Sequence, residues 1–205
     1  MSAPNTTNWI RAGLLTLPVY GLLVFVTTFD SQPDQVQEPE AWARYVSTTS
    51  YLVSHLLAAT AGTILAIFGV FALGAYLAAS RASRLGLAAM VTAVAGHALL
   101  LVPSTISTYV TPAIGEAYLS GMKDVITGVE FHPAMIVTYL LGLVLAFVGN
   151  VLLGVAVWRS GTLPKWAGAL WATSVLLFYV LGAVLGIFTT GASLPRSPWA
   201  HCSWW

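Results

Sequence analysis

The chain has 205 residues, of which 58% are hydrophobic and 7% are charged, and its formal net charge is +1. Soluble domains carry roughly 25% charged residues, so the composition excludes an ordinary soluble domain and predicts an integral membrane protein. The near-neutral charge, without a basic run, argues against a nucleic-acid partner. The single cysteine, Cys202, excludes an internal disulfide, a CxxC redox pair and a thiolate metal cluster.

Apolar stretches long enough to cross a membrane recur along the chain. A hydrocarbon core of about 30 Å takes about 20 helical residues to cross. We therefore expect an all-α bundle of five transmembrane helices in a single domain, near residues 10–29, 51–79, 85–109, 132–158 and 166–190. Residues 30–50 and 110–131 are then loops, and residues 191–205 form a tail. The first stretch lacks a small-residue cleavage site, so we interpret it as a retained helix and not as a signal peptide.

The charged residues separate to the two ends of the predicted bundle. At one end all charges are basic: Arg11, Arg81, Arg84, Arg159 and Lys165. The other end holds all seven acidic residues, together with Arg44, Lys123 and Arg196. Because cytoplasmic loops carry an excess of Lys and Arg, we predict a multi-pass protein with its N-terminus inside and its C-terminus outside.

The outer loops contain helix-start patterns of their own. Thr111 precedes Pro112, and these residue types favour the cap and the first position of a helix. Pro39 can start a similar helix before the second span. We expect short interfacial helices on the outer membrane surface at both places, with an ordered loop as the alternative.

Small residues mark the helix faces that we expect to pack together. Lipid gives helices no hydrophobic reason to associate, so contact faces collect residues that allow close backbone approach. The expected faces are Ala59, Gly62, Ala66 and Gly69 in the second span, Ala89, Ala93 and His97 in the third, Gly142, Ala146 and Gly149 in the fourth, and Gly182 and Gly186 in the fifth.

Three histidines fall in or beside the spans, at different depths. At about 1.5 Å per helical residue, counting from the basic hairpins places His55 and His132 about 40 Å up, near the outer interface. The same count places His97 about 20 Å up, near the membrane midplane. His55 and His132 are therefore expected to face each other, and His97 to lie apart from both.

Polar side chains at similar depth suggest a polar core around His97. Tyr179 lies at the level of His97, and Asn150 and Tyr20 lie just below it. Thr92 and Ser174 fall in the same layer. Ser and Thr in membrane helices often bond their own backbone, so either a connected network or separate local bonds would explain the layer.

The hairpins 51–109 and 132–190 share a plan. Each has an outer histidine, a small-residue stripe, a cytoplasmic arginine and a returning helix. We interpret them as candidate parallel repeats related by an axis along the membrane normal.

Three functions are compatible with these features. We expect first a non-enzymatic membrane protein, an accessory or structural subunit or a ligand-binding bundle, with no catalytic residues and no separate metal site. The alternative is an electron-transfer subunit that binds haem b, with His55 and His132 as axial ligands. The second alternative is a proton or small-solute transporter that uses His97, since a midplane ionisable residue is a functional candidate. The bilayer, and other membrane subunits, are the expected partners.

A basic turn leads directly into the last predicted helix at residues 157–172, with the sequence VWRSGTLPKWAGALWA. This segment resembles the corresponding hairpin of uncharacterised actinobacterial multi-spanning membrane proteins of the domain-of-unknown-function type. The resemblance covers a small part of the chain and mostly reflects topology. It implies a bacterial inner-membrane protein of four to six helices, and it implies no activity or cofactor.

Overall fold

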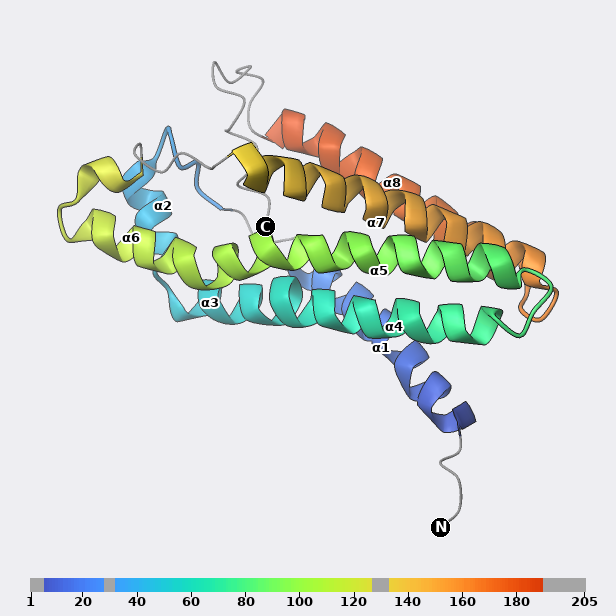
Figure 1. Cartoon of the computed structure of the whole chain (residues 1–205). Coiled ribbons are helices and arrows are strands. Elements are labelled where there is room, and N and C mark those ends of the chain that lie inside the picture. The colour runs from blue at the N-terminus through green and yellow to red at the C-terminus, as the bar shows by residue number, and fades with distance from the viewer. Residues whose placement is uncertain (1–5, 28–31, 127–132, 190–205) are drawn as a thin grey trace, which may run out of the picture.

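The computed structural model describes residues 6–27, 32–126 and 133–189. Within these ranges the chain forms helices joined by short connections, without a strand. In chain order (Figure 1) the elements are α1 (Thr6–Thr27), α2 (Pro39–Val46), α3 (Thr49–His55), the π-helix η1 (Leu56–Ala61), α4 (Gly62–Leu77), α5 (Ser83–Thr105), the π-helix η2 (Ile106–Val110), α6 (Thr111–Leu119), the 3-10 helix η3 (Lys123–Val125), α7 (Pro133–Ser160) and α8 (Lys165–Thr189).

Several of these helices can cross a membrane. By length and composition, the described residues contain four such segments, Asn8–Val26, Thr49–Leu77, Ser83–Leu119 and Pro133–Ser160. They overlap the first four predicted spans. At the position of the fifth, α8 is a helix of 25 residues. The prediction of an all-helical chain with several helices able to span a membrane is thus confirmed for the described residues.

The third spanning segment differs from its prediction. It was expected to end near residue 109, before a separate helix capped by Thr111, but helix continues through α5, η2 and α6 to Leu119. The predicted cap is wrong, because α6 has no side-chain cap and Thr111 has ordinary right-handed helical backbone angles. The wider turns of η2 lie between Pro103 and Pro112. Since a proline ring disrupts the regular helical hydrogen bonds, the helix widens there and continues.

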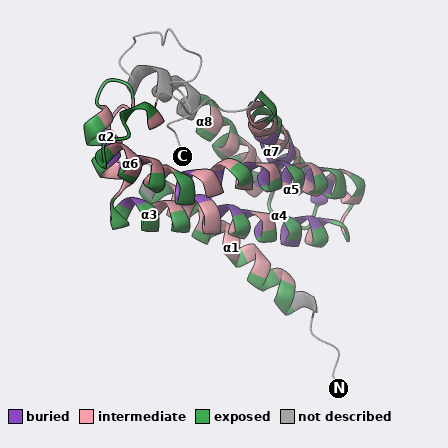
Figure 2. Ribbon diagram, turned by 60° about the vertical axis from the view of Figure 1, so that its left-hand side comes forward, coloured by how far each residue is buried: buried purple, intermediate pink, exposed green. Residues whose placement is uncertain are grey.

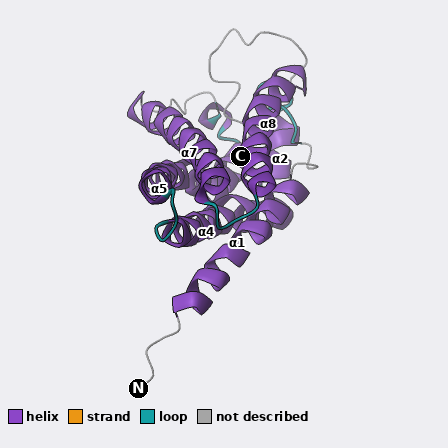
Figure 3. Ribbon diagram, turned by 90° about the vertical axis from the view of Figure 1, so that its right-hand side faces the viewer, coloured by secondary structure: helices purple, strands orange, loops and turns teal. Residues whose placement is uncertain are grey.

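The spanning helices pack in series, each against the next. Contacts run from α1 to α4, from α4 to α5, from α5 to α7 and from α7 to α8, so α1 and α8 stand at the two ends of this series of contacts; Figure 3 shows the bundle end-on. Buried positions concentrate on α4, α5 and α7, whereas α1 has none in its spanning window (Figure 2). The α4–α5 and α7–α8 hairpins meet at one end of the bundle, opposite α2 and α6 (Figure 1).

A small second core lies at the α2 and α6 end. The start of α2 at Pro39 is confirmed. Trp42, Ala43 and Val46 of α2 pack with Tyr51 of α3, and α2 lies against α6. This core anchors the α2 segment on the two longest spanning segments. That α2 and α6 lie at a membrane surface stays a prediction.

The predicted contact faces are confirmed in the second, third and fourth spans, where each of the ten named residues is buried. The α5–α7 seam is especially close. A Cβ placed on Gly96 would lie 2.1 Å from the amide nitrogen of Ala146, and one on Gly149 would lie 2.3 Å from that of Ala93. The backbones therefore touch directly. Gly182 and Gly186 lie outside the residues whose surroundings the structure describes.

Candidate functional site

His97 is buried on α5, with 6% of its surface exposed. Its Nδ1–H donates a hydrogen bond to the carbonyl oxygen of Ala93, 2.8 Å away on the same helix. Directly beside it, Gly96 makes the close contact with α7. The geometry thus places His97 in the packed α5–α7 seam, with its resolved hydrogen bond inside its own helix.

The other polar groups expected around His97 also bond locally. Asn150 Nδ2–H donates to the carbonyl of Ala146 at 2.8 Å, Thr92 donates to that of Ala88, and Ser174 to that of Trp171. Each of these bonds stays within one helix. Among the described residues, no hydrogen bond resolved in the structure links His97 to Asn150 or Tyr179, so the structure favours separate local bonds over a connected network.

Tyr179 of α8 and Tyr20 of α1 each pack against a neighbouring span. The Tyr179 ring packs edge-on against Phe147 of α7, with ring centroids 5.3 Å apart, and against Phe178 at 5.6 Å. The Tyr20 ring lies over Gly62. Tyr179 thus packs against α7, and Tyr20 packs against α4.

One helix-to-helix hydrogen bond was not predicted. The indole Nε1–H of Trp171 on α8 donates to the carbonyl oxygen of Asn150 on α7, 3.0 Å away. The Asn150 side chain bonds within α7 while its backbone carbonyl receives this bond. Asn150 thus fixes α8 on α7 through its backbone, which a sequence pattern of side chains does not reveal.

The two π-helical segments of the described chain lie side by side, η1 in the second span and η2 in the third. Thr60 of η1 and Thr108 of η2 join them through their hydroxyl oxygens, 2.9 Å apart. Thr108 in turn donates to the carbonyl of Ser104 at 2.8 Å. Because Thr108 uses its proton there, Thr60 is the donor in the pair. π-Helical turns are rare and frequently occur at functional sites, so this junction is the candidate site.

A second contact lies beside the first on η2, toward the small core that α2 forms with Tyr51. The Tyr51 hydroxyl lies 3.2 Å from both the carbonyl oxygen and Oγ of Ser107. Tyr51 and Thr108 are fully buried. We call the set Tyr51, Thr60, Ser104, Ser107 and Thr108 the hydroxyl cluster. Its members on the third span recur at helical spacing, which is the signal that could have identified it.

His55 adjoins the hydroxyl cluster. Its ring stacks on that of Tyr51, with centroids 3.8 Å apart and an interplanar angle of 26°. Its Nδ1 lies 3.0 Å from the carbonyl oxygen of Tyr51, so Nδ1–H donates there, and in the neutral ring Nε2 would carry the lone pair. Its proposed partner, His132, lies outside the described residues.

Trp42 supplies an unsatisfied donor next to this cluster. It packs in the same core as Tyr51 and is 3% exposed. Its indole Nε1 is buried with no hydrogen-bond partner within the described part of the chain. Buried polar groups are nearly always paired, so this N–H is available to a bound acceptor.

The hydroxyl cluster and the Trp42 indole are neutral groups. A hydroxyl group that donates its proton in one hydrogen bond can still accept others. The Trp42 N–H can donate one. The arrangement suits an uncharged group that both donates and accepts. Among the described residues, no group of three or more His, Cys, Asp or Glu side chains could hold a metal ion.

Comparison with protein-family models, with curated proteins and with solved structures finds no match for this chain. The kinship suggested by the 157–172 hairpin stays a prediction.

Proposed function

We propose that five helices cross a bacterial inner membrane, with the N-terminus inside and the C-terminus outside. Two observations support this topology. α8 packs along α7 and is long enough to span, and Arg81, Arg84, Arg159 and Lys165 line one cleft at the hairpin end, as the positive-inside rule expects of a cytoplasmic face.

Cysteine labelling tests this topology. With Cys202→Ser as background, single cysteines at Ala79 and Thr162 are expected to react with a membrane-impermeant maleimide only after cells are opened. Cysteines at Gln37 and Ser120 are expected to react on intact cells. The reverse pattern would refute the orientation, and opposite sides for Ala79 and Thr162 would refute the span arrangement.

Within this topology, we propose a ligand-binding bundle that catalyses no reaction and serves as an accessory subunit. Its ligand is an uncharged amphiphile with a hydroxyl-bearing headgroup. The observation that carries this proposal is the junction of η1 and η2, where the hydroxyl cluster lies between two widened helices beside the unpaired Trp42 N–H.

The surroundings of the junction favour an amphiphile. Leu52, Val53, Leu56 and Leu57 on α3 and η1 are exposed apolar side chains that would contact a ligand's hydrocarbon chain. The headgroup would then reach the hydroxyl cluster from the lipid side. A charged headgroup would be desolvated there without an opposite charge, at a cost of several kcal/mol.

A titration with a short-chain monoacylglycerol tests this site. We expect the ligand to raise the melting temperature of the full chain in neutral detergent. Thr60→Val/Thr108→Val preserves shape and removes both hydroxyls. One intramembrane hydrogen bond contributes about 0.6 kcal/mol. This free energy corresponds to a roughly threefold change in the dissociation constant, so the variant should bind at least about threefold more weakly. Ser174→Ala is the control, because the Ser174 hydroxyl bonds within α8. Equal affinity in the double variant would refute the site.

Haem b binding through His55 is the second candidate. The anchoring of Nδ1 on a backbone carbonyl favours it, because metal-binding histidines typically donate their other N–H in this way. Bound haem would supply one-electron transfer. The purified protein would then show a Soret band that His55→Ala removes and His97→Ala retains. Absence of the band after reconstitution with haem would refute this candidate.

Transport of protons or solutes through His97 stays a prediction. Its resolved bond within α5 supports a packing role for this side chain.

A further inference from the structure

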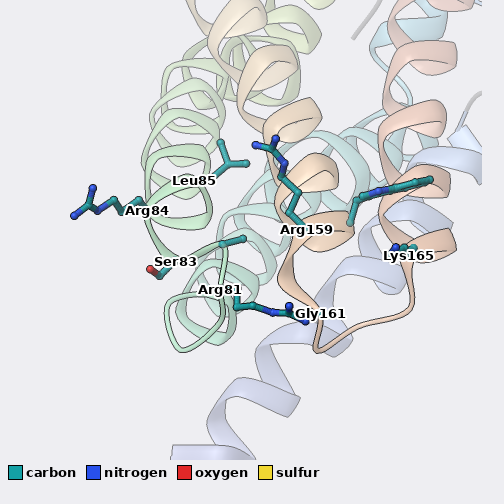
Figure 4. Close-up of a pocket in the computed structure, with 9 residues that line it drawn as sticks. Arg81, Ser83, Arg84, Leu85, Arg159, Gly161 and Lys165 are labelled. Atoms are coloured by element: carbon teal, nitrogen blue, oxygen red, sulfur yellow. The ribbon is translucent and has the colours of Figure 1, made fainter.

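A basic cleft lies at the end of the bundle opposite the hydroxyl cluster. It has a volume of about 780 Å³ and is formed where the α4–α5 and α7–α8 hairpins meet. Four of its lining residues are cations: Arg81, Arg84, Arg159 and Lys165. Figure 4 shows Arg81 reaching from one hairpin to Gly161 in the other, and Arg84 pointing away from the other labelled side chains.

Opposite charge is missing from this end among the described residues. The described acids lie in the segments at the other end: Asp34, Glu38, Glu40, Glu116 and Asp124. The ion pair found in the described structure also lies there, between Arg44 and Glu40. The cleft therefore concentrates positive charge that an anion from outside the chain would neutralise.

Serine hydroxyls close the two hairpin turns that lie beside these cations. Ser80 Oγ accepts a hydrogen bond from the Ala82 N–H at 3.1 Å. In the other turn, Ser160 Oγ accepts from the N–H of Thr162 at 3.3 Å. Gly161 has a φ of +70°, and a Cβ there would overlap the Arg81 guanidinium. Glycine at this position thus allows Arg81 to lie against the second hairpin.

Two helix N-termini border the same cleft. α5 begins at Ser83 and α8 at Lys165, and the first residues of both line it. The first-turn N–H groups of a helix have no partner within the helix, and the helix dipole favours an anion there. The N–H groups of Ser83 and Ala167 already donate to the carbonyl oxygens of Ser80 and Pro164, so the helix dipoles add to the attraction of the four cations without these two groups.

We propose that this cleft binds the phosphate group of an anionic lipid headgroup. Guanidinium groups form paired hydrogen bonds with phosphate oxygens, and basic pockets between spanning helices on the cytoplasmic side suit acidic headgroups. Trp158 also lines the cleft and is 47% exposed. It provides an apolar surface for the adjoining acyl chain.

The test is calorimetric titration of the full chain in neutral detergent. Short-chain phosphatidylglycerol is expected to bind saturably, and zwitterionic phosphatidylcholine and inorganic phosphate at least tenfold more weakly. Inorganic phosphate that binds as tightly as phosphatidylglycerol would overturn the lipid assignment in favour of a soluble phosphate compound. Binding in micelles does not depend on the proposed orientation or on the hydroxyl cluster.

Variants that remove positive charges locate the binding site. Arg81→Gln/Arg159→Gln should weaken phosphatidylglycerol binding by about fivefold for each cation removed. Arg11→Gln, an exposed cation of α1 outside the cleft, should leave binding unchanged. Because Arg81 also contacts Gly161, Lys165→Gln is a second variant that leaves this contact intact, and it should weaken binding about fivefold. Unchanged binding in both cleft variants would overturn the proposal.

Discussion

Replacing Gly96 with alanine tests the α5–α7 seam. The added Cβ would lie 2.1 Å from the amide nitrogen and 2.6 Å from Cα of Ala146, whereas ordinary Cβ contacts begin near 3.4 Å. Both obstructing atoms belong to the α7 backbone and cannot rotate away. The two helices would have to separate by about 1 Å, a shift that an interior packed at crystal-like density resists.

The expected cost follows from this displacement. Overpacking a well-packed interior typically costs about 1–3 kcal/mol. The Gly149 contact with Ala93 lies on the same seam and must open as well, so we expect a loss near the upper end, about 3 kcal/mol. The assay is reversible unfolding in mixed micelles, followed by circular dichroism.

Gly21→Ala is the matched control. Gly21 is on α1, and a Cβ there would meet nothing within 4 Å. Alanine is the better helix former by up to about 1 kcal/mol in water, so this variant should be as stable as the parent or slightly more so. If Gly96→Ala unfolds at the same denaturant concentration as Gly21→Ala, the seam is not as close as the structure has it.

Two further substitutions separate bonds between helices from bonds within them. Trp171→Phe removes the hydrogen bond to the Asn150 carbonyl and should lower the free energy of unfolding by about 1 kcal/mol; an unchanged value in the same unfolding assay would mean that this bond does not hold α8 on α7. His97→Leu removes a bond within α5 and should cost less than about 1 kcal/mol. A loss as large as that of Gly96→Ala would show that His97 has an essential partner on another helix.

The positions of the helices and their contact faces could be predicted because each follows from a local rule. Hydropathy over a helix length locates a span. Small residues at helical spacing locate a contact face, since they are what lets backbones approach. The burial of Ala93, Ala146 and Gly149 follows directly from this rule.

The π-helical segments could not be predicted in the same way. An extra residue per turn leaves no composition signal, and Pro112 favours a helix start as readily as it favours a widened turn. In the structure α6, which continues α5, packs against α2, a tertiary contact that no local sequence pattern reveals. The hydroxyl cluster depends on that continuation, because η2 places Thr108 beside Thr60.

The predicted polar layer shows a second limit. Depth counting placed Thr92, Asn150 and Ser174 at one level, but depth does not fix direction around a helix. In a membrane the nearest acceptor for a short polar side chain is often its own i−4 carbonyl, and Thr92 and Asn150 take it. The Gly154–Gly168 contact between α7 and α8 was not predicted, since the expected contact face of the fifth span was Gly182 and Gly186.

Photolabelling tests the central claim, a neutral ligand at the η1–η2 junction, most directly. A monoacylglycerol with a diazirine near its headgroup would be bound to the full chain, irradiated and mapped by mass spectrometry of peptides. We predict labels on residues 51–60 and 104–111, reduced in Thr60→Val/Thr108→Val. Labels spread evenly over the lipid-facing helices, and unchanged in that variant, would contradict the claim.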